Sequence, residues 1–137
     1  PEERQRYWDA TTLDEPPDPW LQRMARAPLL VVVLASKDAY LDRYAEPDKG
    51  WTDRDESRWP VPYWDIDTGF AALLMLLTAV DEGLGALFFG IFPEHMTSFR
   101  AAFDVPDAYT PIGAIASSPA RLPFTSSRKP RTTSLAA

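Results

Sequence analysis

The sequence predicts a single domain of 137 residues that combines helices with the strands of a sheet. The prediction depends on three stretches: the β-branched run PLLVVVLAS at residues 28–36, an apolar helix with a short aromatic strand in residues 65–90, and the small apolar run PIGAIASS at residues 111–118. Apolar residues make up 45% and charged residues 25%, which is ordinary for a soluble globular protein. The chain is therefore expected to fold around one core.

The N-terminal third leads into the first strand. Residues 1–10 are charged and compatible with a helix, the prolines in residues 14–19 prevent a continuous helix there, and residues 20–27 predict a second short helix. The run at residues 28–36 is apolar without alternation, which is typical of a strand buried on both faces. We expect it to be a central strand of the sheet.

A long connection follows this strand. Residues 37–45 predict a short helix or turn, and residues 46–64 an irregular segment dense in charge, proline and aromatic side chains. Because Trp51, Trp59, Tyr63 and Trp64 need surfaces on which to pack, we expect an ordered excursion that lies over another surface.

The clearest organising signal is the helix at residues 70–80, which is apolar at nearly every position and should be covered on most sides. Asp67 or Thr68 can cap its start, and Gly83 can take the left-handed conformation that ends a helix. The apolar stretch is too short for a bilayer, so we expect no membrane span. So small a chain cannot readily cover such a helix, and we expect a homodimer.

Two further elements complete the domain. Residues 86–89 predict a short inner strand. Pro93 suits the first turn of a helix that continues to Phe103 and places Met96, Phe99 and Phe103 on one side. Residues 111–118 predict a second buried strand, whose small residues allow close approach of a neighbouring backbone. Residues 119–137 are polar and basic, and predict an extended C-terminal arm.

The composition excludes several kinds of function. A net charge of −6 argues against non-specific nucleic-acid binding, and the lack of cysteine suits a reducing cytosol. His95 is the only histidine, so a metal site is not expected. The sequence shows no glycine-flanked serine that would serve as a nucleophile. It shows no phosphate-binding glycine loop either, because Gly83 and Gly85 follow a helix rather than a strand. No catalytic side chain is therefore singled out.

The order of these segments resembles the flavin-dependent nitroreductase family. The family-like stretches are residues 65–90 followed by Phe92-Pro93-Glu94, the strand PLLVVVLAS before them, DVPDAYTPIGAIASS after them, and the basic segment SSRKPRTTSL near the end. Each motif is weakly specific, but the ordered set covers roughly residues 27–135. The stretch at residues 65–90 resembles the family's apolar helix, G-L-G turn and strand that delivers backbone to the flavin.

The resemblance implies an α+β fold with a mixed, largely antiparallel sheet flanked by helices, assembled as an intertwined homodimer. It implies FMN bound at the subunit interface, reduced by NAD(P)H, with electrons passed to a small-molecule acceptor such as a nitroaromatic or a quinone. The protein's share of such chemistry is to position and tune the flavin. A cytoplasmic location is expected.

The resemblance also implies a set of flavin contacts. The backbone of Leu87, Phe88, Phe89 and Gly90 matches the strand end beside the flavin ring. Arg128 matches the phosphate-binding arginine of the C-terminal arm, with Lys129 and Arg131 as neighbours. The positions that contact the flavin from the second subunit are Tyr63 and Trp64.

Two departures from the family pattern leave alternatives open. The family's N-terminal phosphate-binding arm has no counterpart, and the Phe88-Phe89 pair is apolar where the family often has a polar residue. One alternative is a non-catalytic flavin-binding or storage protein in which Trp51 and Trp59 stack on the flavin. The other is a structural domain without a cofactor.

Overall fold

The computed structural model of the chain describes residues 1–12 and 19–119. Its helices are α1 (Glu2–Thr11), α2 (Pro19–Met24), α3 (Lys37–Ala45), α4 (Tyr63–Asp81) and α5 (Met96–Ala102), and its strands are β1 (Leu29–Ala35), β2 (Gly85–Phe89) and β3 (Thr110–Ser118). Two single turns of 3-10 helix, η1 (Glu56–Arg58) and η2 (Pro93–His95), lie in the connections. The elements expected from the sequence are therefore present. Apart from Pro119, the expected C-terminal arm lies outside the described residues.

The strands form an antiparallel sheet with the order β1-β3-β2. The expectation that the PLLVVVLAS strand is central is wrong for the described part of the chain, because β3 lies between β1 and β2. The predicted inner position of β2 is wrong in the same way. The prediction that this strand is buried on both faces is also wrong for the described residues, because only Val33 and Ala35 of β1 are buried and Leu29 and Leu34 are exposed. An apolar run indicates neither how completely each face is covered nor which strands lie beside it. The small residues of β3 suit the central place, since helices and strands can approach them closely.

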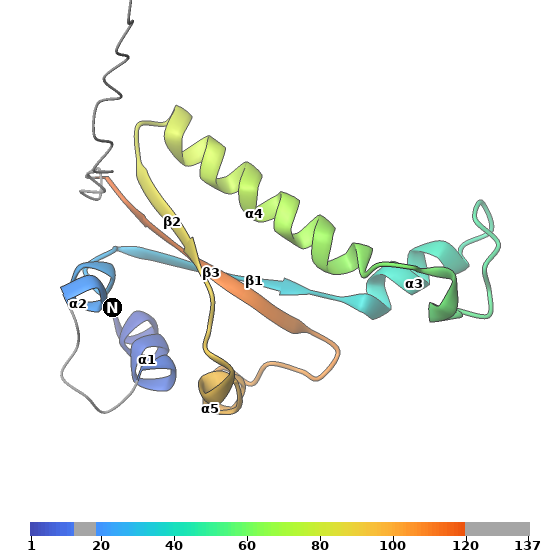
Figure 1. Cartoon of the computed structure of the whole chain (residues 1–137), viewed down its shortest axis with the longest axis horizontal. Helices are drawn as coiled ribbons and strands as arrows, with labels where there is room; N and C mark the ends of the chain where they lie inside the picture. The colour runs from blue at the N-terminus through green and yellow to red at the C-terminus, as the bar shows by residue number, and fades with distance from the viewer. Residues whose placement is uncertain (13–18, 120–137) are drawn as a thin grey trace, which may run out of the picture.

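Helices cover the two faces of the sheet unequally (Figure 1). On one face α1, α2 and α5 enclose a core whose buried members are Tyr7, Trp8, Met24, Ala27, Phe99, Ala114 and Ala116. Met96 and Phe103 pack against this core beside Phe99, as the helical spacing predicts. On the other face α4 packs on a smaller cluster of Val33, Ala72 and Ile115. Together these layers form a mixed α+β arrangement.

Helix α4 begins seven residues before the apolar run and has 19 residues. Its N-cap position is Pro62, and Thr68 lies inside the helix, where its hydroxyl donates to the Trp64 carbonyl oxygen at 2.7 Å. The predicted cap at Asp67 or Thr68 is therefore wrong. Gly83 has φ of +72° and the Leu84 amide donates to the Ala79 carbonyl, which confirms the predicted left-handed end of the helix.

Residues 1–12 and 19–119 cover only one side of α4, which contradicts for this part of the chain the expectation of cover on most sides. Its buried residues are Ala72 and Ala79. The opposite side carries five apolar side chains that are at least half exposed, here called the α4 stripe: Phe70, Leu73, Leu74, Leu77 and Val80. Their spacing places them on one helical face.

The longer extent of α4 also changes the argument about membranes. Among the described residues, it is the one helix long and apolar enough to cross a bilayer by length and composition alone. A single helix of this kind is weak evidence for a span, although only 6% of its apolar window is buried among the described residues.

Candidate functional site

The strand end expected beside a flavin consists of the last residues of β2 and the residue that follows. Leu87, Phe88 and Phe89 belong to β2, and Gly90 comes directly after it. Within the described chain β2 pairs only with β3, so its other edge faces no strand. Backbone donors and acceptors on such an edge are available to a ligand.

Phe88 and Phe89 have different surroundings because they point to opposite faces of the sheet. Phe89 packs into the α1 side, where its ring stacks on Trp8 with centroids 5.8 Å apart and meets Trp20 edge to face at 5.5 Å. Phe88 pairs with Ile115, which faces α4, and keeps 37% of its surface exposed. Of the two rings, Phe88 is the one a ligand could reach.

Sequence reasoning missed the contribution of α1 to this strand end. Trp8 is 7% exposed, and its indole Nε1 finds no acceptor among the described residues. Tyr7 lies beside it with ring centroids 5.1 Å apart, and burial raises the pKa of Tyr7 to about 12. The apolar pair Tyr7-Trp8 within an otherwise charged helix was the available signal.

Tyr63 and Trp64 lie far from β2 in the same chain. They start α4, whereas β2 begins just beyond the other end of that helix (Figure 1). A helix of this length spans about 28 Å. One chain therefore does not bring Tyr63 and Trp64 together with the strand end. Arg128, Lys129 and Arg131 lie outside the described residues.

Tyr63 and Trp64 instead belong to a surface cluster of rings around α3 and the long connection. This cluster, here called the aromatic cap, consists of Tyr40, Tyr44, Trp51, Trp59, Tyr63 and Trp64. Trp59 is its hub, with centroids 4.5 Å from Tyr44, 5.0 Å from Tyr40 and 5.2 Å from Trp51. The expectation of an ordered excursion packed on another surface is confirmed.

Charged groups surround the aromatic cap. Arg58 lies over the Trp51 ring at 5.3 Å, and Lys49 over the Tyr44 ring at 5.4 Å. Ion pairs tie the connection to α3: Lys37 to Glu56 at 2.7 Å, and Arg54 to Asp38 at 3.1 Å and to Asp42 at 3.0 Å. All are exposed, so each contributes little to stability. Their number along one segment keeps the connection on α3.

A tyrosine of the aromatic cap and two aspartates of the neighbouring connection have shifted pKa values. Partial burial, reinforced by a hydrogen bond to Tyr44, raises the pKa of Tyr40 to about 12. Hydrogen bonds from the Ser57 amide at 2.9 Å and the Ser57 hydroxyl at 2.8 Å lower the pKa of Asp55. A hydrogen bond from Arg43 likewise lowers the pKa of Asp48. These groups hold the loop and do not converge on a cavity.

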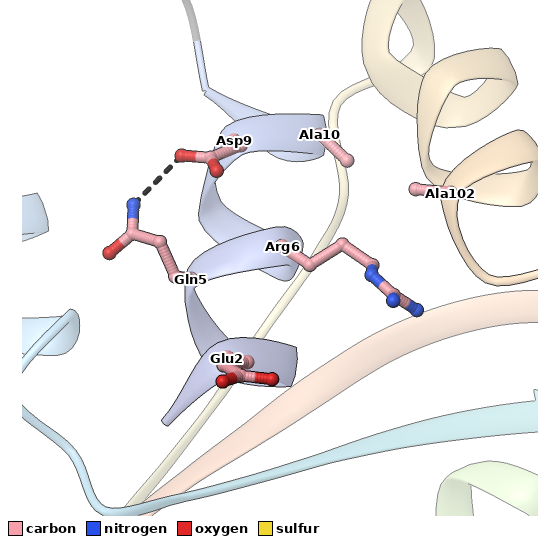
Figure 2. A pocket seen from close by; sticks show the side chains of 6 residues that line it. All are labelled: Glu2, Gln5, Arg6, Asp9, Ala10 and Ala102. Carbon is pink, nitrogen blue, oxygen red and sulfur yellow. Dashed lines mark hydrogen bonds between the residues drawn. The ribbon is translucent and has the colours of Figure 1, made fainter.

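A shallow groove lies elsewhere, between α1 and α5 (Figure 2). Its lining residues are Glu2, Gln5, Arg6, Asp9, Ala10 and Ala102. Gln5 donates to the Asp9 carboxylate at 2.8 Å, and Arg6 pairs with Glu3 at 3.2 Å. Gln5 and Asp9 are thus engaged with each other and Arg6 with a residue outside the lining, and no residue of β2 lines the groove. It offers no arrangement of acid, base and nucleophile.

The donor set at the β2 strand end fits one part of a flavin. Backbone groups of an open strand edge and an exposed aromatic ring suit the polar edge and the face of a planar heterocycle. Among residues 1–12 and 19–119, no group of three or more His, Asp or Glu side chains could hold a metal ion. The part of a flavin that the β2 strand end fits is its ring system. The residues expected at the flavin phosphate lie outside the described residues.

Comparison with known proteins identifies the family of the chain. No curated protein sequence matches the chain. A family model described as Nitroreductase family matches residues 2–117, which is most of the chain. Membership of that family implies flavin-dependent oxidoreduction. The chain therefore belongs to the nitroreductase family.

Proposed function

We propose that this protein is an FMN-dependent oxidoreductase that accepts hydride from NAD(P)H and passes electrons to nitroaromatics, quinones or similar small acceptors. The observation that carries the proposal is the family match over residues 2–117, which implies an oxidoreductase. Bound FMN would supply the hydride-accepting and electron-donating chemistry. The sequence singles out no catalytic side chain, which is consistent with chemistry carried by a cofactor.

The residues of this chain would then bind and orient the flavin. The backbone of residues 87–90 would meet the polar edge of the ring system from the open edge of β2. Arg128, with Lys129 and Arg131 nearby, would bind the phosphate, for which the planar guanidinium is suited. Tyr63 and Trp64 would reach the flavin from a second subunit, because in one chain they lie at the other end of α4.

We further propose a homodimer that forms through the α4 stripe. The stripe consists of five exposed apolar side chains without a charged residue among them. A monomeric soluble protein rarely leaves so continuous an apolar face in water. A two-fold dimer would cover the stripe of each chain with that of the other. The lack of cysteine fits a reducing compartment, and we propose a cytoplasmic location.

The first test is the visible absorption spectrum of the purified full chain after incubation with FMN and desalting. The proposal expects retained flavin bands, and steady oxidation of NADH or NADPH when a quinone or nitroaromatic is added. Arg128→Ala should release FMN more readily, with Arg121→Ala as a control for loss of one cation from the same basic tail. A protein that retains no flavin would leave only the family assignment.

The alternative of a flavin-storage protein predicts a different outcome. In that case the protein would retain FMN but would not turn over NAD(P)H with any acceptor. Trp51 and Trp59, the rings expected to cover the flavin in a storage protein, contact each other at 5.2 Å within the aromatic cap. Tyr63 and Trp64 have aromatic partners in the same cluster, so the turnover assay decides between the two functions.

A further inference from the structure

Gly113 lies in the central strand β3, beside the end of β2. It pairs with Val33 of β1, directly beside a bulge at which the register of β3 shifts by one residue. A Cβ at residue 113 would lie 2.8 Å from Cε2 of Phe88, closer still to Cζ of that ring, and 2.8 Å from the carbonyl oxygen of Phe89. Real Cβ atoms essentially never have neighbours nearer than 3.0 Å. Any other residue at this position would therefore displace both a ring and the backbone of β2.

The contact fixes the strand end from one face while an aromatic core fixes it from the other. The Phe88 ring lies on Gly113 on the α4 side of the sheet. The Phe89 ring is stacked on Trp8 on the opposite side. Because consecutive side chains of a strand point to opposite faces, the peptide between these residues is held from both sides. The position of this peptide then depends on how closely the Phe88 ring approaches β3.

We propose that Gly113 is a positioning residue for the flavin site: by lacking a side chain it lets the β2 strand end lie close against β3, and so it sets the place of the Phe88–Gly90 backbone. The inference rests on the proposed function, because that backbone is the expected contact with the flavin ring. Gly113 itself would not touch the cofactor. It acts through Phe88 and Phe89.

The test compares isotope-labelled full-length proteins: wild type, Gly113→Ala, Phe88→Ala, and the double variant. Amide resonances of Phe89 and Gly90 report the strand end without any ligand. Gly69→Ala is the matched control, because it adds the same methyl group at a glycine in α4 around which a Cβ would meet nothing within 4 Å. FMN affinity, followed by quenching of flavin fluorescence, reports the site.

We expect Gly113→Ala to shift the Phe89 and Gly90 resonances and to weaken FMN binding by about tenfold or more. Gly69→Ala should leave both resonances in place. Gly113→Ala should weaken FMN binding less in the Phe88→Ala background than in wild type, because removal of the Phe88 ring frees space for the new methyl group. The comparison is made against Phe88→Ala because the Phe88 ring is itself within reach of a ligand, and the smaller effect separates positioning from a general loss of stability.

Unchanged Phe89 and Gly90 resonances in Gly113→Ala, or FMN binding within about twofold of wild type, would overturn the proposal. If Gly113→Ala does not fold, the double variant decides, because removal of the Phe88 ring relieves the closest contact of the new methyl group. The proposal then requires the double variant to fold, and a double variant that also fails to fold would overturn it. A wild type that binds no FMN would refute the proposed function, while the ligand-free resonances would still decide the role of Gly113.

Discussion

Single residues differ widely in how much of the fold depends on them, and Phe99 is the clearest case. Its side chain is 2% exposed and lies between Tyr7, at a centroid distance of 5.8 Å, and Phe103 at 5.1 Å. Phe99→Ala should lower the free energy of unfolding by about 3–5 kcal/mol, because it removes a buried ring and leaves a cavity. Urea denaturation monitored by circular dichroism measures this change.

The matched control is Phe92→Ala, which removes the same ring from a position that is 67% exposed. Its effect should stay within about 0.5 kcal/mol. Equal losses in the two variants would contradict the arrangement of α1 and α5 around Phe99.

A second prediction at this scale concerns pH. Asp55 has its pKa lowered below 3.8 by the Ser57 amide and hydroxyl, so its ionised form stabilises the folded loop. That contribution is fully present above the ordinary pKa and is lost as the pH falls through the lowered value. Asp55→Asn should therefore loosen the loop at pH 7, and the difference from wild type should shrink as the pH falls below the ordinary pKa of an aspartate and through the lowered pKa of Asp55.

Intrinsic tryptophan fluorescence of the aromatic cap, recorded against pH, measures this difference. Glu94→Gln, in η2, is the control for loss of one carboxylate. A difference between Asp55→Asn and wild type that does not shrink as the pH falls through the acid range would show that ionisation of Asp55 is not its cause.

Among the elements, the aromatic cap should behave as a separate cooperative unit. It lies at one end of the molecule beyond the sheet (Figure 1) and is held mainly by ring contacts centred on Trp59. Trp59→Ala removes these contacts, each of which contributes about 0.5–1.5 kcal/mol. Amide hydrogen exchange in residues 46–64 should accelerate by about tenfold or more, while β3 keeps its protection.

Trp20→Ala is the control, since Trp20 contacts Phe89 in the other core and should leave exchange in the loop unchanged. If Trp59→Ala accelerates exchange in β3 as much as in the loop, the cap is part of the global folding unit instead.

The elements were predictable from sequence because each depends on local pattern. Pro93 and Gly83 mark helix ends through their own backbone preferences, and both predictions are confirmed. The order of strands was not predictable in this way. The apolar run of β1 and the small residues of β3 both indicate burial, and only the pairing of β3 with both neighbours shows which strand is central.

At the scale of the whole molecule, the candidate site was predictable only in part. The resemblance placed residues 87–90 at a strand end, and among the described residues that end lies on an open edge of the sheet. The contributions of Trp8 and Gly113 depend on contacts between segments distant in sequence, which no local pattern reports. Tyr63 and Trp64 can join the site only across a subunit interface.

The α4 stripe gives the first prediction at this scale. Leu74 is 64% exposed at the centre of the stripe. Leu74→Glu would place a charge in the proposed interface, where burial of an unpaired charge is strongly unfavourable. Light scattering after size exclusion should show the mass falling from twice 15.4 kDa to 15.4 kDa.

Ala101→Glu is the control, because it adds the same charge to an exposed position of α5 on the other face of the sheet. A wild type that is already monomeric would contradict the proposed dimer. If the wild-type protein binds lipid vesicles instead of a second copy of the chain, the stripe is a membrane-binding face.

The last prediction joins assembly to cofactor binding. If the flavin contacts β2 of one chain and Tyr63 and Trp64 of the other, a monomer offers only half of the contacts, and FMN binding must depend on dimer formation. Leu74→Glu should then bind FMN about tenfold or more weakly, and the apparent affinity of wild type should fall on dilution below the dimer dissociation constant. Fluorescence titration of FMN at several protein concentrations measures both effects, with Ala101→Glu expected to follow wild type. A monomeric Leu74→Glu that binds FMN as tightly as wild type would place the flavin within one chain, and the role proposed for Tyr63 and Trp64 would be wrong while that of the β2 strand end would stand.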